Sequence, residues 1–478
     1  MNTKGGPWVA LLALATLATG MALALAADAQ RAVLMPAIAS IVVYMAFTLA
    51  LYQRLRHSLF GEIGFFFLSA AFAYTLMPAA TFILADVELS QGWVWEKLSL
   101  LLPDADALGV HLWRHVLFMA GTAVGYLLVR GAARSNAPTP MPALENEGFM
   151  ITLALAIILA ATTAVAILSA PVQFYIDHYL RFEHLGWFEL RIVYVLLLLK
   201  TSAYYVLMAV LFRGFARYRL LAVTAVIAIC AYELSYSLGS RIETLSVMLG
   251  AGCLYHFLVR PVTLKGGLVA LSAIVVLFSL VEVVRMLDFG GSASANLLAD
   301  NEFGPASEFG AVFFTGYHLY FERSSGSLPP ASIAMFFNDL LAVLPFVENE
   351  EWHPMYWYAY HYFPDALVPP ATIGPIAESA VWGGEIDLAL RAVAIGALYA
   401  LVMRWFLPRR QEWWALVIYS YLFATCIMTL KYSVLYQLSP LVRIIGPGLL
   451  VFWLAKRLVG SGSQLTSLPS GRQHSIER

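Results

Sequence analysis

The sequence predicts an all-α polytopic membrane protein with about 12 transmembrane helices and one large external loop. Of its 478 residues, 60% are hydrophobic and 12% are charged, which is about half the charged fraction of a typical soluble domain. Apolar stretches near 20 residues, the length that crosses ~30 Å of hydrocarbon, recur along the chain. The formal net charge is -1, so no overall field attracts nucleic acid, and we expect no such partner.

The predicted spans are 7–27, 32–52, 62–85, 115–130, 149–170, 191–212, 220–237, 243–259, 267–286, 386–403, 412–430 and 438–455. The first span also fits a cleaved secretory signal, but its apolar length favours a retained helix. The chain then divides into residues 1–286 with nine helices, an external (periplasmic) loop over 287–385, residues 386–459 with three helices, and a disordered cytoplasmic tail over 460–478.

The basic residues indicate the orientation, because 17 of the 29 fall in alternate connections and at the termini. By the positive-inside rule that face is cytoplasmic, and both termini lie in the cytoplasm. These basic residues are Lys4, Arg54, Arg56, Arg130, Arg134, Arg213, Arg217, Arg219, Arg260, Lys265, Arg404, Arg409, Arg410, Lys456, Arg457, Arg472 and Arg478.

The connection 287–385 is too long to be a mere link, which indicates a functional segment. It begins with the flexible pair Gly290-Gly291. Its apolar stretches Phe309 to Tyr320 and Pro330 to Phe346 are too short or interrupted to span a bilayer. We expect short interfacial or re-entrant helices there.

Ionisable residues in or at the outer edge of spans are costly unless they are paired or face water. They are Lys200, Glu233, Arg241, Glu243, Glu282, Arg285, Arg391, Lys431 and Arg443. Lys200 and Glu233 fit a buried structural pair better than a role in chemistry. Arg285 and Arg443 are explained equally well as side chains that extend to the interface. Arg241 differs, because a tight turn places it at the N-terminus of the next helix, where the dipole favours phosphate.

Two motifs carry a resemblance to a known family. The first runs from Gly239-Ser-Arg241-Ile-Glu-Thr-Leu through an apolar helix, with ten residues between Arg241 and Gly252. The second is Ile373-Gly374-Pro-Ile-Ala-Glu378, followed by Trp-Gly383-Gly384. With the hydrophobic layout and the late external loop, they resemble the O-antigen polymerase (Wzy-like) family of oligosaccharide repeat unit polymerases. The loop does not repeat the pattern of an arginine and a glycine separated by ten residues. The residue eleven positions after Arg323 is Ala334.

The resemblance implies a bacterial inner-membrane glycosyltransferase, in which a glycan on polyprenyl diphosphate is moved onto another lipid-linked unit at the outer face. Arginine suits the leaving diphosphate, because its planar fork donates to two oxygens. We assign this role to Arg241, with Arg323, Arg285 and Arg443 as lower-ranked helpers. A chain-length-regulating copolymerase is an implied partner, and the lipid bilayer is the other. No cofactor and no metal site is predicted.

A base is needed for the acceptor hydroxyl. Glu378 is the first choice, because its motif leads from the loop into a span. His318 with Glu322, which are neighbours if helical, and His353 or His361 are the alternatives. In the aromatic run 351–363, Tyr356, Trp357 and Tyr358 are predicted to stack on sugar, whereas Trp352 and Phe363 fit an aromatic belt.

Two other functions stay open. A ligase that uses the same donor differs only in the acceptor. A transporter or flippase for lipid-linked sugars is favoured by the number of spans and by Lys200 and Glu233 inside them.

Overall fold

The structure, a computed structural model, describes residues 31–55, 59–84, 105–131, 146–168, 185–236, 241–263, 265–267, 269–270, 305–337, 353–363, 373–433 and 438–465. Within these ranges the regular structure is entirely helical, which confirms the all-α prediction. The helices are α2 (Arg31–Leu55), η2 (Leu59–Gly61), α3 (Ile63–Leu84), α5 (Ala105–Arg130), α6 (Glu147–Leu168), α8 (Trp187–Arg213), α9 (Phe215–Tyr236), α10 (Arg241–Leu258), α13 (Pro305–Ser325), α14 (Ile333–Phe336), α16 (Pro354–Tyr362), α17 (Pro375–Trp382), α18 (Glu385–Arg409), α19 (Trp413–Thr425), α20 (Met428–Lys431), α21 (Leu438–Pro440), η5 (Leu441–Ile445) and α22 (Gly446–Leu465).

Seven helices in the described part of the chain are long and apolar enough to cross a membrane: Ala32–Leu55, Asp106–Arg130, Glu147–Leu168, Phe188–Arg213, Phe215–Leu234, Glu385–Arg409 and Leu438–Leu458. Shorter apolar helices cover Ile63–Ala79 and Trp413–Thr425, and α10 coincides with the predicted span 243–259. The predicted spans 7–27 and nearly all of 267–286 lie outside the described residues. The structure therefore supports a polytopic membrane protein.

Two predicted spans differ in their limits. Helix α5 begins at Ala105, ten residues before the predicted start, because His111, Arg114 and His115 interrupt the apolar pattern without ending the helix. The predicted span 412–430 is broken after Thr425, where a turn at Cys426 and Ile427 separates α19 from α20. A break inside a membrane frees backbone carbonyls that need a partner.

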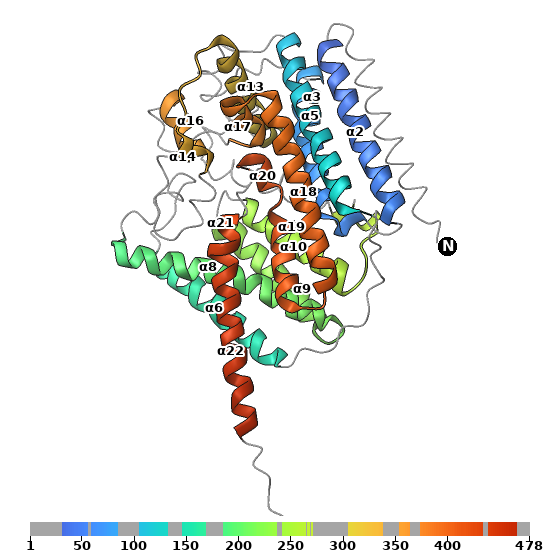
Figure 1. The fold of residues 1–478 in the computed structure, drawn as a ribbon. Coiled ribbons are helices and arrows are strands. Elements are labelled where there is room, and N and C mark those ends of the chain that lie inside the picture. Colours follow the sequence, from blue (N-terminus) through green and yellow to red (C-terminus); the bar gives the residue numbers. More distant parts are fainter. Residues whose placement is uncertain are drawn as a thin grey trace, which may run out of the picture.

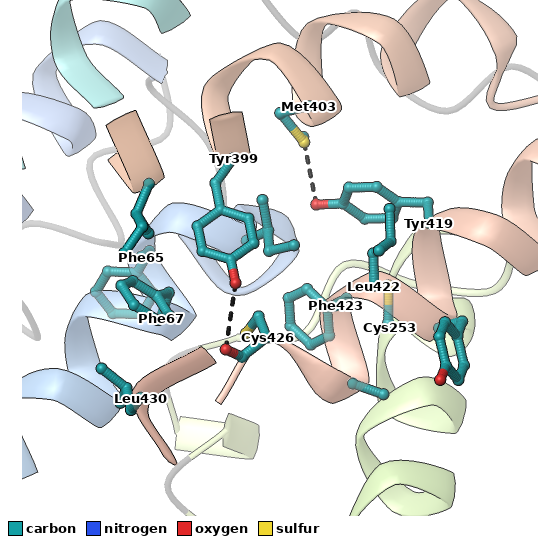
Figure 2. Close-up of a cluster of buried hydrophobic side chains, with 14 of the residues drawn as sticks. Phe65, Phe67, Cys253, Tyr399, Met403, Tyr419, Leu422, Phe423, Cys426 and Leu430 are labelled. Carbon is teal, nitrogen blue, oxygen red and sulfur yellow. Dashed lines mark hydrogen bonds between the residues drawn. The ribbon is translucent and has the colours of Figure 1, made fainter. Parts of the chain in front are cut away.

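Tyr399 supplies that partner. Its hydroxyl lies 3.2 Å from the carbonyl oxygen of Cys426 (Figure 2). The same hydroxyl lies 2.8 Å from Oγ1 of Thr429. The surrounding core is aromatic: the ring of Tyr419 stacks on Phe406 with centroids 3.9 Å apart, and its hydroxyl donates to the carbonyl of Gly61 at 2.6 Å. This core joins α3, α18 and α19.

The most extensive helix contact in the described part of the chain is between α5 and α18, and glycines make it possible. A Cβ on Gly125 would lie 2.1 Å from the carbonyl oxygen of Val393, and a Cβ on Gly396 would lie 2.1 Å from that of Thr122. No side chain fits there. Small residues at such crossings let membrane helices pack backbone to backbone, so these glycines fix the distance between α5 and α18.

One end of the bundle, here called the basic end, is fastened by arginines. Arg54 and Arg404 donate to the carbonyls of Leu127 and Val129, which belong to the last turn of α5. Arg130 forms a buried ion pair with Glu62, with Nη2 to Oε1 at 2.8 Å. Terminal carbonyls of a helix have no partner within the helix, so the arginines complete the hydrogen bonds of α5.

The other end carries the loop helices. In Figure 1, α13, α14, α16 and α17 gather at the top, whereas α22 extends from the opposite end. The stretch predicted as Phe309 to Tyr320 lies in the longer helix α13, and α14 covers part of 330–346. Because α13 packs on α3 and on α17, this part of the loop is docked on the membrane helices.

Replacing Gly396 by Ala should destabilise the protein, because the new methyl group meets the backbone of α5. We expect a loss of about 1–3 kcal/mol, the usual cost of overpacking. Gly148→Ala is the matched control, since a Cβ at this position in α6 meets nothing within 4 Å. Unfolding of the detergent-solubilised protein, followed by circular dichroism, measures both. Equal unfolding midpoints for the two variants would contradict the close contact.

Candidate functional site

Polar side chains from four helices meet at the end of the bundle opposite the basic end. Helix α13 packs on α17, α17 leads into α18, and the first half of α5 lies beside both α13 and α18. The side chains that meet there come from α5, α13, α17 and α18. They include Glu378, His318 and Arg323 from the sequence prediction.

Glu378 lies in the first turn of α17 and is buried, with 5% of its surface exposed. The helix starts at Gly374 and Pro375, and a Cβ on Gly374 would lie 2.0 Å from the carbonyl oxygen of Leu430. The motif glycine is therefore needed for the close approach of α20. It fixes the position of Glu378.

Arg391 neutralises Glu378. Its Nη1 donates to the Glu378 carboxylate, and its Nε donates to Asp387 at 2.7 Å. The chain reverses between α17 and α18 at Gly383-Gly384, where Gly384 has a φ of 65°. That conformation is open to glycine at little cost, and it brings the second turn of α18 back over Glu378.

Arg323 lies in the last turn of α13 and binds the C-terminus of α17. Its Nη1 donates to the carbonyls of Ala380 at 2.7 Å and Trp382 at 3.4 Å. Among the described residues no carboxylate forms a salt bridge with it, and its Nε and Nη2 face the backbone at Gly384. Only Nη1 of Arg323 is hydrogen-bonded in the described structure, although the charge of Arg323 also acts on Glu385.

Arg114 of α5 connects the same helices. Its guanidinium lies 3.8 Å above the ring of Tyr320, and its Nε donates to Glu385 at 2.9 Å. The Tyr320 hydroxyl is 2.9 Å from Oγ of Ser379. Burial raises the pKa of Tyr320 to about 12, so the phenol stays neutral and holds α13 against α17.

His318 and Glu322 lie one turn apart on α13, as the predicted helical spacing required. His318 Nδ1 is 2.8 Å from the Tyr358 hydroxyl, and its Nε2 is 3.6 Å from Oε1 of Glu322. Burial lowers the pKa of His318, and the charge of Glu322 opposes that shift. Burial also raises the pKa of Tyr358, so its phenol stays protonated and donates to Nδ1. The remaining N–H of His318 then faces Glu322, because a carboxylate only accepts.

Residues 354–362 of the aromatic run form α16, and Trp352 lies outside the described residues. The ring of Tyr356 is 40% exposed, whereas Trp357 and Tyr358 are buried against the protein. The two buried rings have no free face for a sugar, so the predicted stacking surface is reduced to Tyr356. Tyr358 contributes through its hydroxyl, which the sequence prediction did not anticipate.

The other predicted arginines lie elsewhere. Arg241 opens α10 and Arg443 lies in η5, and these elements pack on α8 and α19 instead of on α13 or α17. Arg285 lies outside the described residues. Arg114 and Arg391 were missed as site residues. Arg391 follows Asp387 by four residues, and that spacing on one helix face was an available signal.

Comparisons of the chain with models of protein families, with curated proteins and with solved structures find no match. In the described residues, no group of three or more His, Cys, Asp or Glu side chains is placed to hold a metal ion. The geometry of the arginines and carboxylates therefore carries the functional argument.

The residue that precedes α16 makes this helix sensitive to acid. His353 caps this helix by accepting the N–H of Met355 at 3.2 Å through Nδ1, and burial lowers its pKa to about 4. Protonation removes that acceptor. The unfolded chain binds the proton near pH 6.5 and the folded chain near pH 4, so stability is full above pH 6.5 and declines as the pH falls between these values.

His353→Asn should remove this decline, because asparagine caps a helix at any pH. We expect the unfolding free energy of the native chain to lose up to roughly 1.4 kcal/mol per pH unit more than that of the variant between pH 6.5 and 4. Denaturant titrations in detergent at several pH values measure the difference. Parallel pH profiles would contradict the role of His353.

Proposed function

We propose that the chain is a polysaccharide polymerase that joins polyprenyl-diphosphate-linked oligosaccharide repeat units by glycosyl transfer at the outer face of the bacterial inner membrane. The proposal includes about twelve spans, cytoplasmic termini and an external loop over 287–385. One observation supports it most: α13 carries His318, Glu322 and Arg323 within six residues, beside the Glu378 motif of α17. The proposed proton acceptor and the proposed phosphate ligand are therefore close together at one end of the membrane helices.

Arg323 is the proposed ligand of the leaving diphosphate. Its Nη1 alone is hydrogen-bonded, its Nε and Nη2 lie near Gly384, and hydrogen bonds between a guanidinium and phosphate oxygens are strong. Arg114 and Arg391 already bind carboxylates. Arg241, Arg285 and Arg443 remain proposed helpers.

The proton acceptor is assigned to the His318–Glu322 pair in preference to Glu378. Glu378 would have to separate from Arg391 before it could take a proton, whereas no described arginine or lysine binds Glu322. The 3.6 Å between His318 and Glu322 is too long for a direct hydrogen bond. A sugar hydroxyl between them could donate to the carboxylate while the imidazole N–H supports its oxygen. Glu378 then positions α17 through Arg391.

Arg323→Gln should abolish long glycan chains while the protein level in the membrane is unchanged. Loss of one such electrostatic contact costs about 10²–10³ in rate. Arg323→Lys should recover part of the activity, and Glu322→Gln should lose it. Arg457→Gln on α22 is the control, because Arg457 stacks on Trp453 far along another helix. Chain-length ladders from cells complemented with each variant are compared on gels. A full ladder from Arg323→Gln would refute the proposal.

The acceptor distinguishes polymerase from ligase. Cells without the protein should accumulate single repeat units on the carrier. Long polymer that is made but left unattached would instead identify a ligase.

One observation favours a transporter as a second candidate. Lys200 and Glu233 form a buried ion pair of 2.9 Å between α8 and α9, and Tyr204 also donates to Glu233. Buried charges inside spans are often parts of transport pathways. The alternative is a pair that only joins the two helices.

The double variant Lys200→Met/Glu233→Met separates these functions. If the pair is structural, Lys200→Met alone should cost about 3–5 kcal/mol, and the double variant should recover most of that stability. Its glycan ladder should then be normal. A stable double variant with no glycan chains would favour the transporter instead.

A further inference from the structure

Two buried histidines on α5 remain without a role in the proposed reaction. His111 and His115 are four residues apart, 0% and 3% exposed, with ring centroids 5.1 Å apart. They face α3 and α13, and α13 is the helix that carries His318. Two histidines with this spacing lie on one helix face and can bind a single metal ion.

The hydrogen bonds fix the proton on each ring. His111 Nε2 is 3.0 Å from the carbonyl oxygen of Phe313, which only accepts, so Nε2 carries the hydrogen. Thr75 donates its hydroxyl hydrogen to the carbonyl of Ala71 at 2.8 Å, so it accepts from His115 Nδ1 at 3.3 Å. The lone pairs are therefore on His111 Nδ1 and His115 Nε2.

Those two nitrogens are buried and make no hydrogen bond in the described structure. An acceptor without a partner in the interior is costly. Histidines that ligate metals usually donate their other N–H to a carbonyl or a similar oxygen, which fixes the tautomer and leaves one lone pair for the metal. His111 and His115 both have that arrangement.

The side chains around His111 and His115 indicate which charge a bound metal ion would carry. The rings of Phe313, Tyr317 and Tyr320 lie near His111, and no described carboxylate forms a salt bridge with either histidine. Arg114 on the same helix adds positive charge. A divalent ion would be poorly compensated by two neutral ligands. Soft monovalent ions suit imidazole and thioether donors, and Met119 lies one turn further on, with its sulfur 3.6 Å from Thr75 Oγ1.

We propose that His111 and His115 bind one soft monovalent cation of the Cu(I) type through His111 Nδ1 and His115 Nε2. The ion holds both rings in place, and their other nitrogens hold the backbone of α13 and the side chain of Thr75 on α3. The site does not depend on the proposed polymerase activity. Occupancy would restrain α13, on which His318 and Arg323 lie.

The probe is Ag(I), which needs no reductant. The full-length chain in detergent carries Cys230→Ala, Cys253→Ala and Cys426→Ala, because free thiols also bind silver. Equilibrium dialysis with elemental analysis should find one tightly bound ion per chain. His115→Ala and His111→Gln should each weaken this binding at least tenfold, whereas His361→Ala, at an exposed histidine, should leave it unchanged.

X-ray absorption on the parent protein gives a test that needs no histidine variant to fold. Two nitrogen neighbours on the bound silver are expected. Binding that survives both histidine variants, or silver with only sulfur neighbours, would overturn the site. Equal, histidine-dependent affinity for Zn(II) would overturn the assignment to a monovalent ion.

Discussion

The close contact of α5 with α18 is the constraint on which the rest of the described structure depends. Gly125 and Gly396 leave no room for a side chain between the two backbones. Because the helices touch there, Arg114 near the start of α5 reaches Glu385 at the start of α18. At the basic end the same contact brings Arg404 to the last turn of α5. The position of α17, which leads directly into α18, follows from this contact.

The arginines of this protein have two roles, which can be distinguished by the groups that each side chain binds. At the basic end Arg54 and Arg404 bind helix carbonyls, and Arg130 forms an ion pair with Glu62. Such contacts satisfy groups that lipid cannot. Arg323 also binds helix carbonyls, but its other donors face the turn at Gly384. Among the described helices α13, α14, α16 and α17, Arg323 therefore combines a fixed position with two nitrogens, Nε and Nη2, that make no hydrogen bond.

The helices were largely predictable, because apolar length alone indicates a span. Helix α13 and the His318–Glu322 neighbours also followed from local spacing. The ion pair of Glu378 with Arg391 did not, because it joins residues thirteen apart across the Gly383-Gly384 reversal. Hydropathy also missed the first ten residues of α5, where His111 is buried and Arg114 is partly buried. The ion pair and the start of α5 both depend on which side chains the tertiary structure buries. A single sequence does not show this.

Helical periodicity explains how α13 could serve both halves of the proposed transfer. His318 and Glu322 are four residues apart and share one face, directed at Tyr358 of α16. Arg323 is the next residue, about 100° further round an α-helix with 3.6 residues per turn, and it is directed at α17. The groups proposed for proton removal and for phosphate binding therefore lie on adjacent faces of a single helix. A shift of α13 would move both groups together, so the spacing between acceptor and leaving group is preserved by the helix itself.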